Sequence, residues 1–306
     1  MIWRRLFRRN REPREAREAL MLAPKTYNTR HPAYDARAAR NDPGRITGAR
    51  SPVQHPILAE IAALANTTSP TSPTHVAAAR WQPVFAAMRV EVEGHPDGVR
   101  LFEQRRALET HLDDLSRRYG AEYVPGWVNV DDGLFLYWLA RRLRPRTIVQ
   151  TGVCNGFSCA LLALALARNG DGGELHAIDL PQVFDPGDPA WTRGGQTYGV
   201  IIPEGKSSGW LVPDSCRDRV HIQTGDAATL LPPLLARLGA IDFFFHDSDH
   251  TYDHMAFEFR EAKRVLEPGG LLVADDIAWN ASLWDAADEW GVAAYNHAGS
   301  MGVAFM

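Results

Sequence analysis

Cysteine is scarce in this sequence, and long apolar runs and a strong net charge of either sign are missing from it. Three of its 306 residues are cysteines, and they form no CxxC pair. We therefore expect no disulfide framework, and we interpret them as reduced thiols of a cytoplasmic protein. The formal net charge is -4, which gives no electrostatic reason to expect a nucleic-acid partner.

No stretch of the sequence is apolar for long enough to span a membrane. A transmembrane helix needs about 20 consecutive apolar residues. The longest apolar run covers residues 159–167, and Arg168 ends it. We expect no transmembrane segment. The sequence also contains no internal repeat, and its apolar share of 45% is enough for a sizeable core.

The N-terminal third has a different character from the rest of the chain. Residues 1–50 are polar, rich in arginine and aperiodic, so we predict that most of them are disordered; a contact with an anionic partner or membrane surface is the alternative. Residues 66–74 read NTTSPTSPT, which is typical of a linker. Leucines at helical spacing predict a helix over 99–119. We assign residues 1–118 to an N-terminal extension, irregular and helical from residue 51, and 119–306 to the main domain.

Strands and helices are predicted to alternate from residue 146 onwards, after a helix over 131–144. Apolar runs separated by helices indicate an α/β fold with a Rossmann-like, doubly wound and mostly parallel sheet. Two short strands at the C-terminus have no room for a helix between them, so they form a β-hairpin and one of them is antiparallel to the sheet. The predicted strands are 146–151, 174–179, 220–225, 241–246, 270–275, 292–297 and 301–306, and the helices between them are 156–168, 227–238, 252–266 and 282–290.

Three of the strand ends carry residues suited to an adenosine ligand, because ligands of such sheets bind beyond the carboxyl ends of the strands. Gly152 and Gly156 follow the first strand and permit a tight turn. Asp179 ends the second strand and is placed to accept hydrogen bonds from a ribose, although it could simply cap a helix. Asp226 follows the third strand and is placed to accept from an adenine amino group.

The glycine spacing helps to choose between adenosine ligands. A dinucleotide is expected with G-x-G-x-x-G, whereas Gly152 and Gly156 give G-x-x-x-G with no third glycine. S-adenosylmethionine carries a sulfonium instead of a phosphate and tolerates this looser turn. We therefore expect S-adenosylmethionine, and we keep an NAD(P) oxidoreductase as a competing hypothesis.

The fourth and fifth strands end in acidic residues that should meet. Asp247 follows one strand, and Asp275 and Asp276 follow the other. Three carboxylates brought together need a positive charge, and an all-oxygen set suits Mg²⁺ or another divalent cation. The alternatives are that these residues cap the following helices, or that His246, His250 and His254 bind zinc.

Residues 149–160, 241–250 and 273–281 resemble the metal-dependent catechol and caffeoyl-CoA O-methyltransferases, which are class I S-adenosylmethionine-dependent enzymes. The resemblance implies that Asp247, Asp275 and Asp276 hold the metal, and it places His250 where the family has a lysine as the general base, with Asp247 as a second catalytic candidate. Trp279 and Asn280 match a Trp-Asn pair of the caffeoyl-CoA branch. The residues that it implies for cofactor binding are Gln150, Gly152, Asn155, Gly156, Ser158, Asp179, Asp226 and Ala227.

The sequence departs from that family at three positions. Gln150 replaces an acidic residue, Asp276 replaces an asparagine, and His250 replaces the lysine, so that the base should titrate near neutral pH. We also predict that the Gly- and Pro-rich insertion at 181–213 covers the ligand.

The function that follows from these residues is methyl transfer from S-adenosylmethionine to a hydroxyl of a small molecule, assisted by a divalent metal (EC 2.1.1 class). The alternatives are a metal-independent O- or N-methyltransferase and a non-catalytic relative that binds the cofactor. A small-molecule methyl acceptor is the expected partner, and a homodimer is the commonest oligomeric state for such a protein.

Overall fold

A computed structural model describes most of the chain beyond residue 72. The residues that it describes are 46–47, 56–65, 73–120, 122–181, 192–193, 196–200, 202–203, 205–277, 279–296 and 300–306. The predicted disorder of residues 1–50 lies outside this set except at residues 46–47. The predicted linker at 66–74 also lies outside it, except for its last two residues, which begin a helix.

The described residues form one large mixed sheet of eight strands in the order β1-β10-β11-β9-β8-β3-β4-β7. The five consecutive strands β9, β8, β3, β4 and β7 run parallel, as predicted. Strand β11 is antiparallel to both β9 and β10, which confirms the C-terminal hairpin. The bounds are β3 Thr147–Thr151, β4 Glu174–Asp179, β7 Val220–Thr224, β8 Ile241–His246, β9 Leu266–Ala274, β10 Ala294–Asn296, β11 Gly302–Phe305 and the edge strand β1 Ile46–Thr47.

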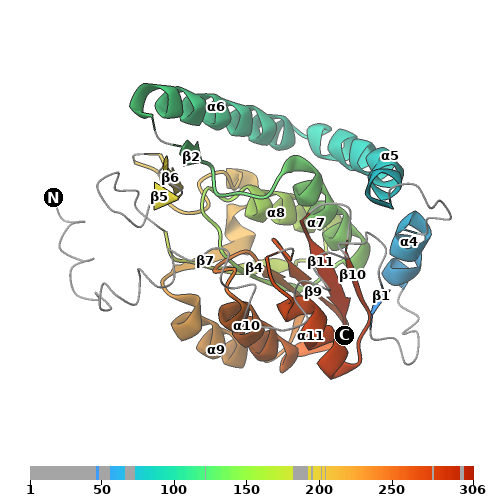
Figure 1. Cartoon of the computed structure of the whole chain (residues 1–306). Helices are drawn as coiled ribbons and strands as arrows, with labels where there is room; N and C mark the ends of the chain where they lie inside the picture. The colour runs from blue at the N-terminus through green and yellow to red at the C-terminus, as the bar shows by residue number, and fades with distance from the viewer. Residues whose placement is uncertain are drawn as a thin grey trace.

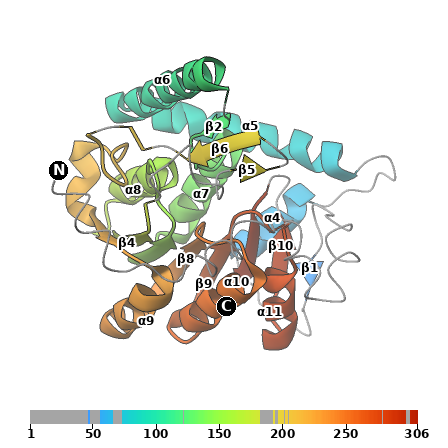
Figure 2. The same ribbon diagram turned by 60° about the vertical axis from the view of Figure 1, so that its left-hand side comes forward.

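Helices cover both faces of this sheet (Figures 1 and 2). Side chains of a strand point alternately to the two faces, and three consecutive phenylalanines of β8 show it. Phe243 and Phe245 lie in the core beneath α7 and α8, whereas Phe244 lies in the core beneath α9, α10 and α11. The bounds are α7 Val130–Leu143, α8 Phe157–Asn169, α9 Ala227–Leu238, α10 Tyr252–Lys263 and α11 Ser282–Trp290.

Three helices precede the main domain, where the sequence predicted an irregular and helical extension. They are α4 Pro56–Ala65, α5 Pro73–Glu93 and α6 Pro96–Tyr119. Trp81 of α5 is fully buried and packs edge-on against Phe135 and Trp138 of α7, so α5 shares the core beneath α7 and α8. The boundary at residue 118 stays a prediction.

The insertion at 181–213 contributes to a second, small sheet of β2 Glu122–Val124, β6 Gln196–Val200 and β5 Thr192–Arg193. A 3-10 helix, η3 Asp214–Arg219, then leads into β7. Strand β9 begins at Leu266 rather than at 270, because α10 ends at Lys263 and the chain pairs with β8 at once. No helix of the described part of the chain is long and apolar enough to cross a membrane.

Candidate active site

The residues that the sequence singled out lie along one edge of the sheet, at the carboxyl ends of five neighbouring strands. Just after four of these strands, a backbone N–H of the following loop donates a hydrogen bond to the end of the neighbouring strand. These bonds run from Gly225 N to Asp179 O, from Gly152 N to Ile178 O, from Asp247 N to Thr151 O and from Asp275 N to His246 O, at 2.8–3.0 Å. The glycine turn and the acidic residues therefore share one edge, as the strand order requires.

The glycine turn after β3 leaves no room for a side chain at its two ends. Gly152 has a φ of +79°, and a Cβ built on it would lie 1.8 Å from the Asp247 carbonyl oxygen. Gly156 has a φ of +89°, and its Cβ would lie 2.5 Å from Gly209 Cα. Glycine is required here both for the backbone conformation and for the close approach of two other segments.

Asp179 holds this turn in place. One oxygen of its buried carboxylate accepts hydrogen bonds from the backbone N–H groups of Val153 and Cys154, at 2.8 and 3.1 Å. The other oxygen accepts a hydrogen bond from the Ser208 hydroxyl. Asp179 thus lies where a ribose was predicted, and a ribose hydroxyl would have to share or replace the contact with Ser208. It caps no helix.

Part of the 181–213 insertion packs onto the turn. Gly209 N donates to Cys154 O, Leu211 N donates to Asn155 O, and Trp210 Nε1 donates to Asn155 Oδ1 at 2.6 Å. We call residues 207–211 the covering segment. The covering segment lies over the glycine turn. That the insertion also covers a bound ligand stays a prediction.

Gln150 and Ser158 brace the turn from within. Gln150 Nε2 donates to Gly152 O at 2.6 Å and to Ser158 Oγ at 2.8 Å, and its Oε1 accepts from Cys159 Sγ. Gln150 has no exposed surface, and both ends of its amide form hydrogen bonds inside the protein. In this structure its side chain therefore supports the turn and does not face a ligand.

Asp226 and Ala227 lie at the start of α9. Asp226 caps the helix by accepting from Ala228 N at 3.0 Å, and its side chain is exposed. Ala227 is buried. An adenine contact at Asp226 stays a prediction, and the carboxylate has lone pairs left for it.

The acidic residues of β8 and β9 form a cluster with His250. One ligand atom each from Asp247, His250 and Asp275 lie within 4.8 Å of one another. Asp276 adjoins them with a φ of +50° and adds charge, although it is not in that set. The Ser300 hydroxyl bridges Asp275 to a fourth carboxylate, Asp132 of α7.

Burial and mutual repulsion raise the pKa values of the carboxyl groups in this cluster. Burial, and then the charges of Asp275 and Asp276, raise the pKa of Asp247 well above its usual range. Burial also raises the pKa of Asp275, and burial with the charges of Asp275 and Asp132 raises the pKa of Asp276 to about 7. Within the described part of the chain, no lysine or arginine pairs with Asp247, Asp275 or Asp276.

His250 completes the cluster with an available nitrogen. Its Nε2 is buried without a hydrogen-bond partner among the described residues and lies 3.8 Å from Asp247 Oδ1. Burial, and then the neighbouring His246, lower the pKa of His250 to about 3. The expectation that His250 titrates near neutral pH is therefore wrong, because the ring has too little contact with water. Carboxylates without a counter-charge beside an unprotonated imidazole fit a divalent cation.

The two alternatives for these residues are not supported. Thr251 caps α10, and Ala281 precedes α11, so Asp247, Asp275 and Asp276 cap neither helix. Among the described residues, His246, His250 and His254 do not bring three ring nitrogens within 4.8 Å of one another, so they form no zinc site of three histidines.

Glu258 and Asp132 were missed by the sequence analysis. Glu258 of α10 is fully buried and contacts His246 Nδ1 at 2.6 Å and His254 Nε2 at 2.8 Å. Burial alone would raise its pKa, but the two histidines outweigh it and lower the pKa well below its usual range. The spacing of four residues between His254 and Glu258 was the available signal for this pair.

A family model described as a methyltransferase domain matches residues 149–277. Residues 149–277 of this chain are therefore similar to a methyltransferase domain. The matched residues run from β3 to the loop after β9, so they include the glycine turn and the acidic cluster. The resemblance noted in the sequence is thereby confirmed.

Relatives of the methyltransferase domain include two named enzymes. A caffeoyl-CoA O-methyltransferase of Eucalyptus globulus is 25% identical over 157 residues, which are 51% of this chain and 54% of that protein. A catechol O-methyltransferase of Niastella koreensis is 29% identical over 159 residues, 52% of this chain and 61% of that protein. The chain thus spans little more than half the length of these relatives. A solved O-methyltransferase structure from Bacillus cereus covers 64% of this chain and 90% of its own, at 16% identity and a TM-score of 0.41.

Proposed function

We propose that this protein transfers the methyl group of S-adenosylmethionine to a hydroxyl of a small molecule, with a divalent cation bound by the acidic cluster. The observation that carries the proposal is the set of carboxylates of Asp247, Asp275 and Asp276, of which Asp275 is buried and the other two are half-buried, and which pair with no lysine or arginine in the described structure. They lie directly beside the glycine turn of a methyltransferase domain.

The proposed place of the methyl donor is the glycine turn and the neighbouring strand ends. Gly152 and Gly156 let a ligand approach the backbone, Asn155 lies within the turn, and Asp179 and Asp226 offer carboxylate oxygens for the ribose and the adenine. Gln150, Ser158 and Ala227 support this surface from beneath. The sulfonium would then point toward β8 and β9, where the acidic cluster lies.

The acidic cluster would hold the cation and orient the acceptor. Asp247 and Asp275 would supply oxygen ligands, and Asp276 adds negative charge. A bound divalent cation would supply positive charge that lowers the pKa of a nearby hydroxyl. The Nε2 of His250 has no hydrogen-bond partner among the described residues, and it would accept the hydroxyl proton and pass it to water.

The chemical step is a displacement at carbon. The acceptor oxygen forms a bond to the methyl carbon while the C–S bond breaks, which leaves S-adenosylhomocysteine and the methyl ether. Most of the acceleration would come from holding oxygen, methyl carbon and sulfur in line.

Turnover before and after metal removal tests this proposal. We expect release of S-adenosylhomocysteine with an ortho-dihydroxy aromatic probe and Mg²⁺, and loss of it in excess EDTA. Asp247→Asn should abolish turnover, whereas Asp113→Asn, which alters an exposed acid of α6, should not. Full turnover in EDTA would remove the metal from the proposal.

A second candidate is a relative that binds the cofactor without catalysis. The contact between Ser208 and Asp179 favours it, since the protein already satisfies an oxygen that the ribose would use. Binding of S-adenosylmethionine without turnover on any hydroxylated acceptor would select this candidate.

A further inference from the structure

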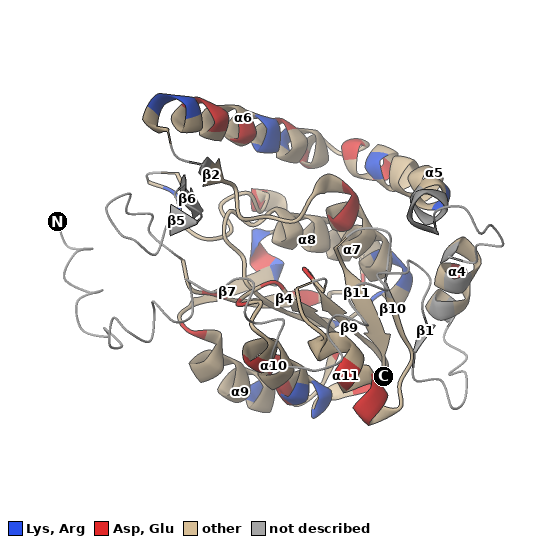
Figure 3. Cartoon of the chain, in the orientation of Figure 1, with Lys and Arg blue, Asp and Glu red and all other residues tan. Residues whose placement is uncertain are grey.

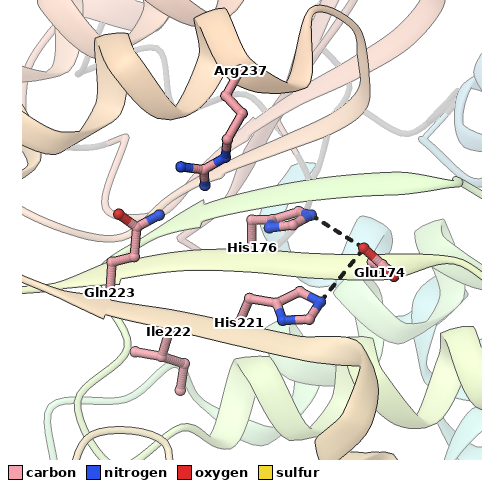
Figure 4. Close-up of a pocket in the computed structure, with 6 residues that line it drawn as sticks. All are labelled: Glu174, His176, His221, Ile222, Gln223 and Arg237. Carbon is pink, nitrogen blue, oxygen red and sulfur yellow. Dashed lines mark ion pairs between the residues drawn. The ribbon is translucent and has the colours of Figure 1, made fainter.

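A second group of metal-ligating side chains lies far from the candidate active site. Glu174 and His176 belong to the first half of β4, and His221 belongs to the first half of β7. Asp179, which contacts the glycine turn, ends β4 at its other end. The group therefore lies toward the opposite end of the strands, beside a surface hollow of about 580 Å³ (Figure 4). The hollow is lined by Glu174, His176, His221, Ile222, Gln223 and Arg237.

The two histidines are brought together by strand pairing. His176 and His221 face each other in the register of the parallel β4–β7 pair. Their rings stack with centroids 4.8 Å apart and planes inclined by 27°. Both rings turn Nε2 toward the same carboxylate, as Figure 4 shows.

The distances in this group match a coordination shell better than they match hydrogen bonds. Each Nε2 lies 3.5 Å from the same Glu174 oxygen. A hydrogen bond would normally be about 2.7–3.2 Å. In a tetrahedral zinc site with bonds of about 2.0–2.1 Å, neighbouring ligand atoms are roughly 3.4 Å apart. One ligand atom from each of the three side chains falls within 4.8 Å of the others.

The cationic side chain that lines the hollow lies clear of the three ligand atoms. Arg237 is the opposing charge in the hollow. In Figure 4 its guanidinium lies on the side of His176 away from Glu174, so it does not occupy the space between the three ligand atoms.

We propose that Glu174, His176 and His221 bind one divalent transition-metal ion, with Zn²⁺ as the best match and water completing the shell. Two imidazoles and one carboxylate suit zinc, whereas Mg²⁺ prefers oxygen ligands only. The side chains of Glu174 and His221 are 52% and 45% exposed, which leaves a path for the ion and its water. The ion would fasten β7, at the edge of the large sheet, to β4, and it is independent of the proposed methyl transfer.

Calorimetric titration of the full-length, metal-free protein with ZnCl₂ tests the proposal, in excess Mg²⁺ so that the acidic cluster is occupied. We expect His176→Gln and His221→Gln each to weaken one zinc site at least ~10-fold. His111→Gln, which alters an exposed histidine of α6, should leave the affinity unchanged. Equal zinc stoichiometry and affinity in all four proteins would overturn the proposal.

A second measurement does not depend on how the variants fold. Histidine ring NMR signals of the wild-type protein, assigned to His176 and His221, should shift on addition of Zn²⁺ and stay unchanged on addition of Mg²⁺. Ring signals of both residues that do not respond to Zn²⁺ would also overturn the proposal.

Discussion

The carboxylates of the acidic cluster determine the chemistry at the scale of single residues. Asp247 and Asp275 lie against each other without a lysine or arginine partner in the described structure, and burial raises the pKa of both. We expect Asp275→Asn to weaken Mg²⁺ binding at least ~10-fold, because a neutral amide replaces a ligand charge. Calorimetric titration with Mg²⁺ measures this change, and Asp113→Asn is the control. Unchanged affinity would exclude Asp275 as a ligand.

The raised pKa of Asp276 predicts how the free energy of unfolding depends on pH. Its pKa is raised from 3.8 to about 7, so between these values the folded state holds a proton that the unfolded state has released. Its contribution to stability is thus present at low pH and is lost as pH rises through about 7. The buried His250 acts in the opposite direction over much of this range, so the useful comparison is between wild type and Asp276→Asn.

We expect metal-free Asp276→Asn to become progressively more stable than wild type as pH rises from about 4 to about 7. Denaturant unfolding at several pH values measures the difference in free energy of unfolding. Excess Mg²⁺ should reduce that difference, since the cation offsets the charge. A difference that does not change with pH would contradict the assigned shift.

The backbone geometry at Gly152 predicts a loss of stability when a side chain is introduced there. Gly152→Ala should lower the free energy of unfolding by about 2–4 kcal/mol, through the positive φ and the overlap with the Asp247 carbonyl. Gly172→Ala is the matched control, since Gly172 has a φ of +71° but no atom within 4 Å of a built Cβ. It should cost about 1 kcal/mol. Equal losses in the two variants would show that the close approach at Gly152 does not matter.

Single residues also show how far a sequence can indicate a site. Asp247 and Asp275 were predictable because each directly follows a buried parallel strand, and such strand ends share one edge. Asp132 could not be predicted as part of the cluster, because its hydrogen bonds to the capping Asn129 already explain an aspartate in the first turn of α7. Its hydrogen-bonded link to the cluster runs through Ser300, which lies 168 residues further on.

At the scale of elements, the covering segment is hydrogen-bonded to the glycine turn. Ser208 and Trp210 attach it to Asp179 and Asn155. If the ribose binds Asp179, Ser208→Ala should tighten S-adenosylhomocysteine binding severalfold by freeing one carboxylate oxygen. Asp179→Asn should weaken it at least ~10-fold, since a hydrogen bond to a charged group is worth about 1.5–3 kcal/mol. Calorimetry measures both, and weaker binding in Ser208→Ala would mean that Ser208 itself contacts the ligand.

The regular elements of the sheet were predictable because apolar runs of the right length alternate with helical patterns. The remaining strands carry no such signal. β1 has two residues, and the small sheet joins β2 to β6, which lies about 70 residues away in the sequence. Pairing of this kind depends on the folded arrangement of distant segments and not on local periodicity.

At the scale of the whole molecule, one sheet carries both sites. The candidate active site lies at the carboxyl ends of its strands, and the proposed zinc site of Glu174, His176 and His221 lies toward their opposite ends. Charges of both signs alternate along the outer helix α6, as Figure 3 shows. The cytoplasmic location, the homodimer and the absence of a nucleic-acid partner stay predictions from the sequence.

The central claim is that the glycine turn and the neighbouring strand ends bind a sulfonium nucleoside or its product. Thermal unfolding with S-adenosylmethionine, S-adenosylhomocysteine or NAD⁺, each with and without Mg²⁺, tests it most directly. At a hundredfold excess over its dissociation constant, a bound ligand stabilises a protein by about 2.7 kcal/mol. We predict that the two sulfur nucleosides raise the melting temperature and that NAD⁺ does not. Stabilisation by NAD⁺ alone, or by none of the three, would contradict the account.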